Sequence, residues 1–161
     1  MPADLRSEFS LPGDPIEVFG MLTNPDFLTE KVALAKSGHY SIEGTSPELT
    51  IQVQRIVEAQ LPPMVQKFVG ENLVVEETQN WSKKDDHHFV AKFSLEIPGA
   101  PVVITGAISL SGQSVTQVEI TGKVKVNVPI FGAAAEPQVV AQINKVLADE
   151  EKLCQQWISK K

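Results

Sequence analysis

Residues 118–161, VEITGKVKVNVPIFGAAAEPQVVAQINKVLADEEKLCQQWISKK, decide the fold of this chain. Apolar and polar residues alternate over residues 118–128, as in a strand with one buried face. Beyond the break at 129–132, apolar residues recur at helical spacing from Glu136 to about Lys160, which predicts one long amphipathic helix. Roughly 25 helical residues span about 37 Å, so the pattern predicts a sheet packed against a single terminal helix.

Six upstream segments show the same two-residue period, at residues 5–11, 40–42, 49–57, 73–81, 89–97 and 102–110. Turn residues separate them, including 44–47, a polar turn at 83–86, and 98–101. Strands with one solvent-exposed face and one buried face, called the dry face below, are typical of an antiparallel sheet. Gly106 and Gly122 lie on the dry face, which predicts either bends or bulges of a strongly coiled sheet, or close packing against the helix.

Two short helices are predicted between the first two strands. Asp14 and Asn24 are suitable N-caps, and a proline follows each at the first helical position. The second apolar stripe continues to Ala35, and Gly38 is predicted to end that helix. A further helix of about two turns is predicted over residues 64–69.

Composition limits the class of protein. The 161 residues are 42% apolar and 21% charged, which fits one globular domain over 1–161. The formal charge of −6, with scattered Lys and Arg, argues against a nucleic-acid partner. With neither a signal-peptide pattern nor an apolar stretch of ~20 residues, we expect a cytoplasmic protein without stable membrane insertion. The single cysteine, Cys154, lies on the apolar helix stripe and is interpreted as a buried structural thiol; we expect no metal and no cofactor.

The order of elements resembles the START-like superfamily, also called SRPBCC or helix-grip, over the whole chain. The sequence PGDP at 12–15, Val18-Phe19 and NPD at 24–26 fit that pattern, and residues 122–136 resemble an uncharacterised actinobacterial branch. Residues 132–136 depart from the Gly-Gly-Lys-like run of that branch. The resemblance implies an α+β helix-grip fold: a seven-stranded curved antiparallel sheet wraps a long C-terminal helix, and two short helices join strands 1 and 2. It also implies a cavity between sheet and helix, used mostly for apolar ligands, although some members are cyclases or hydrolases.

Three polar residues share the dry face of two strands. Arg55 has the phase of Ile51 and Val53, and Glu77 and Gln79 have the phase of their strand's apolar residues. A buried charge must be paired, solvated or ligand-bound. Arg55 could therefore receive a ligand carboxylate, with Glu77 or Gln79 as a second anchor; alternatively the two charged residues form a simple pair, or a bulge returns them to water.

The remaining candidate ligand-binding residues lie on the inward faces of strands and of the last helix. Tyr40 could donate a hydrogen bond or form wall, and Phe89 and Phe93 are predicted as cavity wall. The other predicted lining residues are Ile104, Val124, Ile143 and Leu147. The three histidines, His39, His87 and His88, are interpreted as surface residues. No catalytic motif is apparent.

These features predict a protein that binds or carries a small hydrophobic ligand, such as a lipid, isoprenoid or polyketide-like molecule, between sheet and helix. The alternative is a cyclase- or hydratase-type enzyme acting on such a ligand. A protein-interaction module is the third hypothesis, with its protein partners unknown. The region around 24–38 and the segment 61–70 are predicted to frame the mouth of the cavity.

Overall fold

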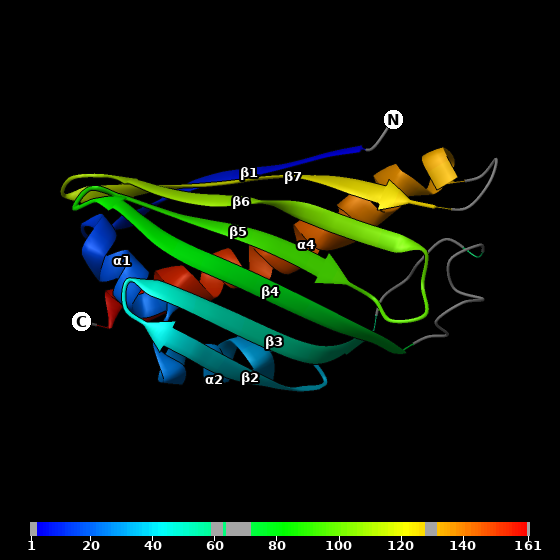
Figure 1. Ribbon diagram of the computed structural model, residues 1–161, viewed down its shortest axis with the longest axis horizontal. Coiled ribbons are helices and arrows are strands. Elements are labelled where there is room, and N and C mark those ends of the chain that lie inside the picture. Colours follow the sequence, from blue (N-terminus) through cyan, green and yellow to red (C-terminus); the bar gives the residue numbers. More distant parts are fainter. Residues whose placement is uncertain (1–2, 59–62, 64–71, 128–131, 161) are drawn as a thin grey trace.

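A computed structural model describes residues 3–58, 63, 72–127 and 132–160. In chain order its elements are β1 (Ala3–Pro12), α1 (Pro15–Leu22), α2 (Pro25–Ala33), β2 (Ser37–Thr45), β3 (Glu48–Glu58), β4 (Asn72–Asp85), β5 (His88–Glu96), β6 (Val102–Gly112), β7 (Val115–Val126) and α4 (Gly132–Ser159). The strands form one antiparallel sheet in the order β1-β7-β6-β5-β4-β3-β2 (Figure 1). The predicted seven-stranded sheet, terminal helix and paired short helices are confirmed.

Local chemistry starts the two short helices where the sequence predicts. The Asp14 carboxylate accepts a hydrogen bond from the backbone N–H of Glu17 at 2.8 Å, and the Asn24 side chain accepts one from Asp26 at 2.8 Å. Each cap precedes a proline at the first helical turn, where a missing N–H costs nothing. These caps fix where α1 begins after β1 and where α2 begins after α1.

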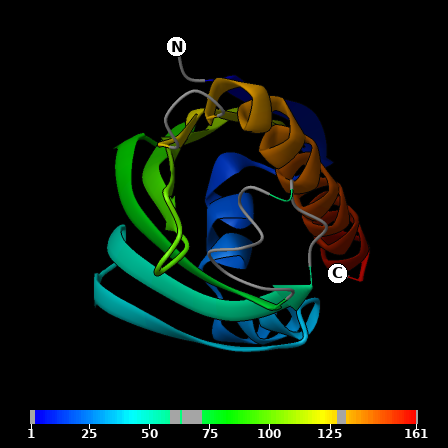
Figure 2. The ribbon, with the colours of Figure 1, turned by 90° about the vertical axis from the view of Figure 1, so that its right-hand side faces the viewer.

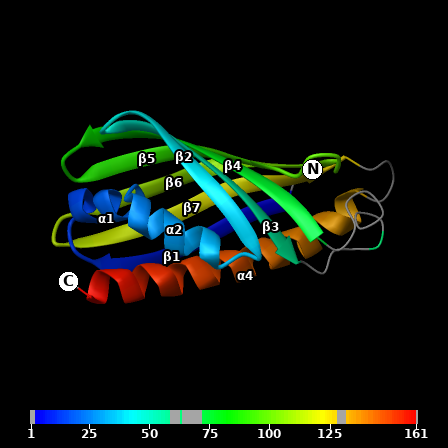
Figure 3. The same cartoon turned by 90° about the horizontal axis from the view of Figure 1, so that it is seen from below.

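The sheet curls around α4, but the helix covers only part of the concave face. α4 packs mainly against β1 and β7 at one edge, while α2 packs against β2 at the other. Figure 2 shows this along the long axis: the strands form an arc, and α4 lies across its open side. Figure 3 shows α1 and α2 on the same side of the sheet as α4. The concave faces of β3, β4 and β5 are therefore not covered directly by α4.

The two inward glycines face each other across β6 and β7. Gly106 pairs with Gly122, and the register continues without a break on both sides. A Cβ on Gly106 would collide with the Thr121 carbonyl oxygen and lie 2.8 Å from Cζ of Phe93. The unbroken register shows that the prediction of bulges here is wrong. The atoms nearest to an added Cβ belong to the paired strand and to Phe93, so these glycines admit the Phe93 ring and a close approach of two strands.

Several boundaries differ from the sequence prediction. α2 ends at Ala33, and Gly38 lies within β2 opposite Arg55, where an added Cβ would be 2.7 Å from the Gln54 carbonyl oxygen. Gly38 is thus required by strand packing rather than by a helix end. β4 continues to Asp85 through a register shift after Lys83, so the polar turn is shorter than predicted. α4 begins at Gly132, earlier than predicted, and the helix predicted at 64–69 lies outside the described residues.

Candidate functional site

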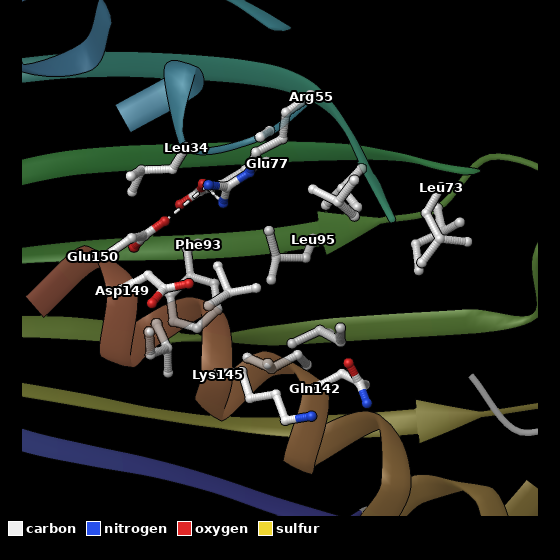
Figure 4. Close-up of a pocket in the computed structure, with 18 of the residues that line it drawn as sticks. Leu34, Arg55, Leu73, Glu77, Phe93, Leu95, Gln142, Lys145, Asp149 and Glu150 are labelled. Atoms are coloured by element: carbon white, nitrogen blue, oxygen red, sulfur yellow. Dashed lines mark hydrogen bonds and ion pairs between the residues drawn. The ribbon is translucent and has the colours of Figure 1, made fainter. Parts of the chain in front are cut away.

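A cavity of about 620 Å³ lies between the concave sheet and α4. It exists because α4 packs on β1 and β7 while β3, β4 and β5 curve away from it. Most of its wall is apolar and comes from the strands, from α4 and from the segment after α2 (Figure 4). Its described lining is Leu5, Leu34, Ala35, Lys36, Arg55, Val57, Leu73, Val75, Glu77, Gln79, Phe93, Leu95, Ile97, Ile104, Ile108, Ile120, Val139, Gln142, Ile143, Lys145, Val146, Leu147, Asp149 and Glu150.

The exposure of the inward side chains distinguishes this wall from ordinary core. Val57, Val75 and Leu95 have the inward phase of their strands, yet each is only half-buried. Leu147 of α4, which faces them, is half-buried too. Apolar side chains that face inward but remain partly accessible to solvent line a cavity rather than a packed core.

A cluster of four ionised side chains lies at one part of the wall: Arg55, Glu77 and Glu150 line the cavity, and Lys31 contacts both carboxylates. Nη2 of Arg55 donates to Glu77 Oε1 at 2.9 Å, and Nη1 donates to Glu150 Oε1 at 2.9 Å. Nζ of Lys31 lies 3.2 Å from Glu77 Oε1 and 3.8 Å from Glu150 Oε1. The cluster joins α2, β3, β4 and α4, and its two cations balance its two carboxylates.

Two neutral side chains fix Glu77 from the sheet. Gln79 donates to Glu77 Oε2 at 2.6 Å, and the Trp81 indole N–H donates to the Gln79 side-chain oxygen at 3.0 Å. Within the described part of the chain, every buried side-chain nitrogen or oxygen has a hydrogen-bond partner. The cluster is therefore complete as it stands, as buried charges require.

The environment keeps the buried members ionised. Burial alone would raise the pKa of Glu77, but the attraction of Lys31 and Arg55, with hydrogen bonds from Gln79 and Lys31, lowers the pKa to about 2. Burial alone would lower the pKa of Arg55, and the opposing attraction of Glu150 and Glu77 raises it. Glu77 thus remains a carboxylate throughout the neutral range.

The lowered pKa of Glu77 predicts a specific loss of stability in acid. Its contribution is fully present above the ordinary value of 4.5 and is lost as the pH falls toward about 2. Over that range we expect the wild type to lose about 3 kcal/mol more unfolding free energy than the Glu77→Gln variant. Urea denaturation at a series of pH values measures this difference. Equal losses in the two proteins would contradict it.

Most predicted ligand-binding residues lie on the cavity wall. Arg55, Glu77 and Gln79 face it as the strand phase indicates, but Arg55 and Glu77 are paired, as the simpler alternative proposed. The apolar members on the wall are Phe93, Ile104, Ile143 and Leu147. The structure thus brings these seven residues together, while a role in binding remains a prediction.

Three predicted wall residues lie outside the described lining, so their predicted position is corrected. Phe89 is buried under α1, where its ring stacks on Phe19 with centroids 4.5 Å apart. The Tyr40 hydroxyl lies 3.3 Å from Oγ1 of Thr29 on α2, outside the hollow. Val124 is fully buried on β7, the strand against which α4 packs.

Two members of the ion cluster, Lys31 and Glu150, were missed by the sequence analysis. Lys31 is four residues after Phe27 on α2 and shares its buried face, with 5% of its surface exposed. Glu150 lies three residues after Leu147 and four before Cys154, within the apolar stripe of α4. A charged residue at helical spacing among apolar ones was the available signal in both cases.

The cluster also belongs to a seam between α2 and α4. Phe27 and Trp157 pack edge to face with centroids 5.8 Å apart, and the Trp157 indole N–H donates to Glu30. Cys154 lines a second, smaller cavity of about 50 Å³ behind the cluster. Burial, with the nearby charge of Glu150, raises the pKa of Cys154 to about 12, as a structural thiol requires.

A curved antiparallel sheet that grips a terminal helix around an open cavity defines a helix-grip protein. A family model described as protein of unknown function (DUF2505) matches residues 6–158. The chain belongs to that family. No curated protein matched the sequence significantly. Among the described residues, no helix has the length and apolar character needed to cross a bilayer.

Solved structures share this fold at low sequence identity. The crystal structure of TTHA0849 from Thermus thermophilus has a TM-score of 0.67 and 14% identity, over 98% of each chain. The Zhui aromatase/cyclase from Streptomyces sp. R1128 has a TM-score of 0.61 and 9% identity, over 98% of this chain and 92% of that one. Norcoclaurine synthase from Thalictrum flavum, in complex with dopamine and hydroxybenzaldehyde, has a TM-score of 0.59 and 13% identity, over 100% and 89%. The fold is thus shared by an aromatase/cyclase and a plant synthase.

Proposed function

We propose that this protein binds or carries a small hydrophobic molecule, such as a lipid, isoprenoid or polyketide-like compound, in the cavity between the sheet and α4. The observation that carries the proposal is the 620 Å³ hollow with half-buried apolar side chains facing into it. A volume of roughly 300–1,000 Å³ with an apolar wall and a few convergent polar groups is typical of small-molecule sites. The proposal takes the chain as one ligand-binding domain of the START-like superfamily, from an actinobacterial branch, acting in the cytoplasm.

Filling the cavity tests this proposal. N-phenyl-1-naphthylamine, a neutral apolar fluorophore, is expected to bind the wild type with increased emission. Leu95→Trp places an indole into the hollow from β5 and is expected to weaken binding at least about tenfold, or about 1.4 kcal/mol. Fluorescence titration gives both affinities, and circular dichroism checks that the fold is kept.

Val103→Trp is the matched control. Val103 is 43% exposed and follows Val102 on β6, so its side chain points away from the concave face. This variant adds the same aromatic group outside the cavity and is expected to bind the fluorophore as the wild type does. Equal binding by Leu95→Trp, or no binding by the wild type, would overturn the proposal. Native mass spectrometry of the purified protein would identify any molecule that copurifies.

A cyclase- or hydratase-type enzyme is the second candidate. It is favoured by the polar groups on the wall, Arg55, Glu77 and Glu150, and by the two enzymes with this fold. Against it, a general base works best with a pKa near the operating pH, whereas Glu77 has a pKa of about 2 and is fully hydrogen-bonded. Chemical change of a polyketide-like probe on incubation with the protein would favour the enzyme; recovery of the unchanged probe favours the carrier.

A further inference from the structure

The two carboxylates of the ion cluster are held unequally. Both oxygens of Glu77 are engaged, by Arg55, Lys31 and Gln79, and its side chain is 8% exposed. The contacts of Glu150 to Arg55 and Lys31 both use its Oε1, and its side chain is 19% exposed. Glu77 is therefore a fixed counterion, while Glu150 is the member that can leave at smaller cost.

The position of Glu150 relates it to the cavity. Arg55 and Glu150 both line the hollow, and Glu150 also lines the smaller cavity, together with Lys31. Figure 4 shows Glu150 reaching from α4 toward Arg55 and Glu77, while Leu73 lies at the opposite end of the wall. Phe93 and Leu95 lie between these two ends. One end of the hollow therefore presents a guanidinium next to the apolar side chains of Phe93 and Leu95, while Lys36, Gln142, Lys145 and Asp149 supply the other polar groups of a mainly apolar wall.

We propose that Glu150 is an internal stand-in for a ligand carboxylate: an apolar molecule with a terminal carboxylate displaces it from Arg55 and leaves its tail along Phe93 and Leu95. This inference rests on the proposed function and names the class of ligand. A ligand carboxylate can form the bidentate contact that guanidinium groups favour. The displaced side chain needs only a rotamer change toward solvent, because Glu150 is already partly exposed.

Charge balance explains why the ligand must be an anion. Two cations face two carboxylates in the cluster. If Glu150 leaves, one buried positive charge is uncompensated, which is costly in a low-dielectric site. A ligand carboxylate restores the balance, and a neutral ligand of the same length cannot. The cavity is thus expected to discriminate an acid from its alcohol.

Removing the stand-in tests the inference. Dodecanoate and 1-dodecanol compete with N-phenyl-1-naphthylamine at neutral pH for the wild type and for Glu150→Gln. The variant is expected to bind dodecanoate about tenfold more tightly than the wild type, because no internal carboxylate competes for Arg55. Its affinity for 1-dodecanol is expected to stay within about twofold. Dodecanoate is also expected to raise the melting temperature of the variant more than that of the wild type.

Glu76→Gln is the charge-matched control. Glu76 precedes Glu77 on β4 but is exposed on the outer face of the sheet, outside the described lining of the hollow, and the described ion pairs of Arg55 go to Glu77 and Glu150. It removes the same charge and is expected to change either affinity by no more than about twofold, through screened long-range attraction. Should Glu150→Gln fail to fold, Glu150→Asp keeps the charge and draws the carboxylate back by one methylene. A gain of about threefold for dodecanoate is then expected.

The outcomes separate the two proposals. If the wild type binds the fluorophore and 1-dodecanol but the Glu150 variants gain nothing for dodecanoate, the stand-in inference is overturned and the apolar site remains. The same gain in Glu76→Gln would show that the effect comes from net charge alone and would overturn the inference as well. If the wild type binds neither probe nor fluorophore, the proposed function itself fails.

Discussion

Replacing Glu77 by glutamine is expected to lower the free energy of unfolding by about 3–5 kcal/mol. Glutamine has nearly the same shape, so the change isolates the charge. Arg55 and Lys31 would stay buried with Glu150 as their remaining described counterion, and the hydrogen bond from Gln79 would meet a neutral group. Denaturant unfolding at neutral pH measures the loss, provided that the slope with denaturant is unchanged.

Glu76→Gln is the control for this change. Glu76 is adjacent in β4 but exposed on the outer face, where it accepts a hydrogen bond from Gln54 at 3.3 Å. An exposed carboxylate contributes little, so the control is expected within about 0.5 kcal/mol of the wild type. A Glu77→Gln variant as stable as the control would show that the ion cluster does not hold α2, β4 and α4 together.

The second large effect is expected at Gly106. In Gly106→Ala the added methyl group would collide with the Thr121 carbonyl oxygen, a backbone atom that cannot move away by a rotamer change. We expect a loss of about 3 kcal/mol, at the upper end of overpacking effects. Thermal or denaturant unfolding measures it. The Phe93 ring, 2.8 Å from the new carbon, would also shift, so fluorophore affinity is expected to fall with stability.

Gly20→Ala serves as the matched comparison. Gly20 lies in α1, and no described atom outside its own neighbourhood lies within 4 Å of a Cβ added there. Alanine at this helical position is expected to be neutral or to stabilise by up to about 1 kcal/mol. If both glycine variants behaved alike, the close approach of β6 and β7 would not be the reason for glycine at position 106.

The alternation along the strands predicted which polar side chains face the cavity, but it could not identify the residues that pair with them. The two-residue period placed Arg55, Glu77 and Gln79 inside, because a strand alternates its side chains between two faces. The contacts of Arg55 with Glu150, and of Glu77 with Lys31, bring together residues from four separate elements. Only the tertiary arrangement decides which helix residue meets which strand residue. A charge within an apolar helix stripe was an available signal for both Lys31 and Glu150, but the sequence analysis did not use it.

Phe89 and Phe93 show the limit of the same reasoning for the cavity. Both have the inward phase of β5, four residues apart, so the sequence pattern treats them alike. α1 covers Phe89 through Phe19, whereas Phe93 extends into the hollow. Whether an inward residue becomes core or cavity wall depends on what lies above it, and a single strand carries no information about that.

The single thiol, Cys154, lines the smaller cavity next to the ion cluster, and its reactivity can report how often the protein opens there. Cys154 is buried and un-ionised at neutral pH, so we expect an alkylating reagent to react only with molecules in which α4 has opened and exposed the sulfur. The rate of alkylation therefore reports how often α4 opens, and the measurement needs no engineered label. Because a guest bound under the helix would hold it down, the same rate reports occupancy of the hollow for compounds that carry no chromophore.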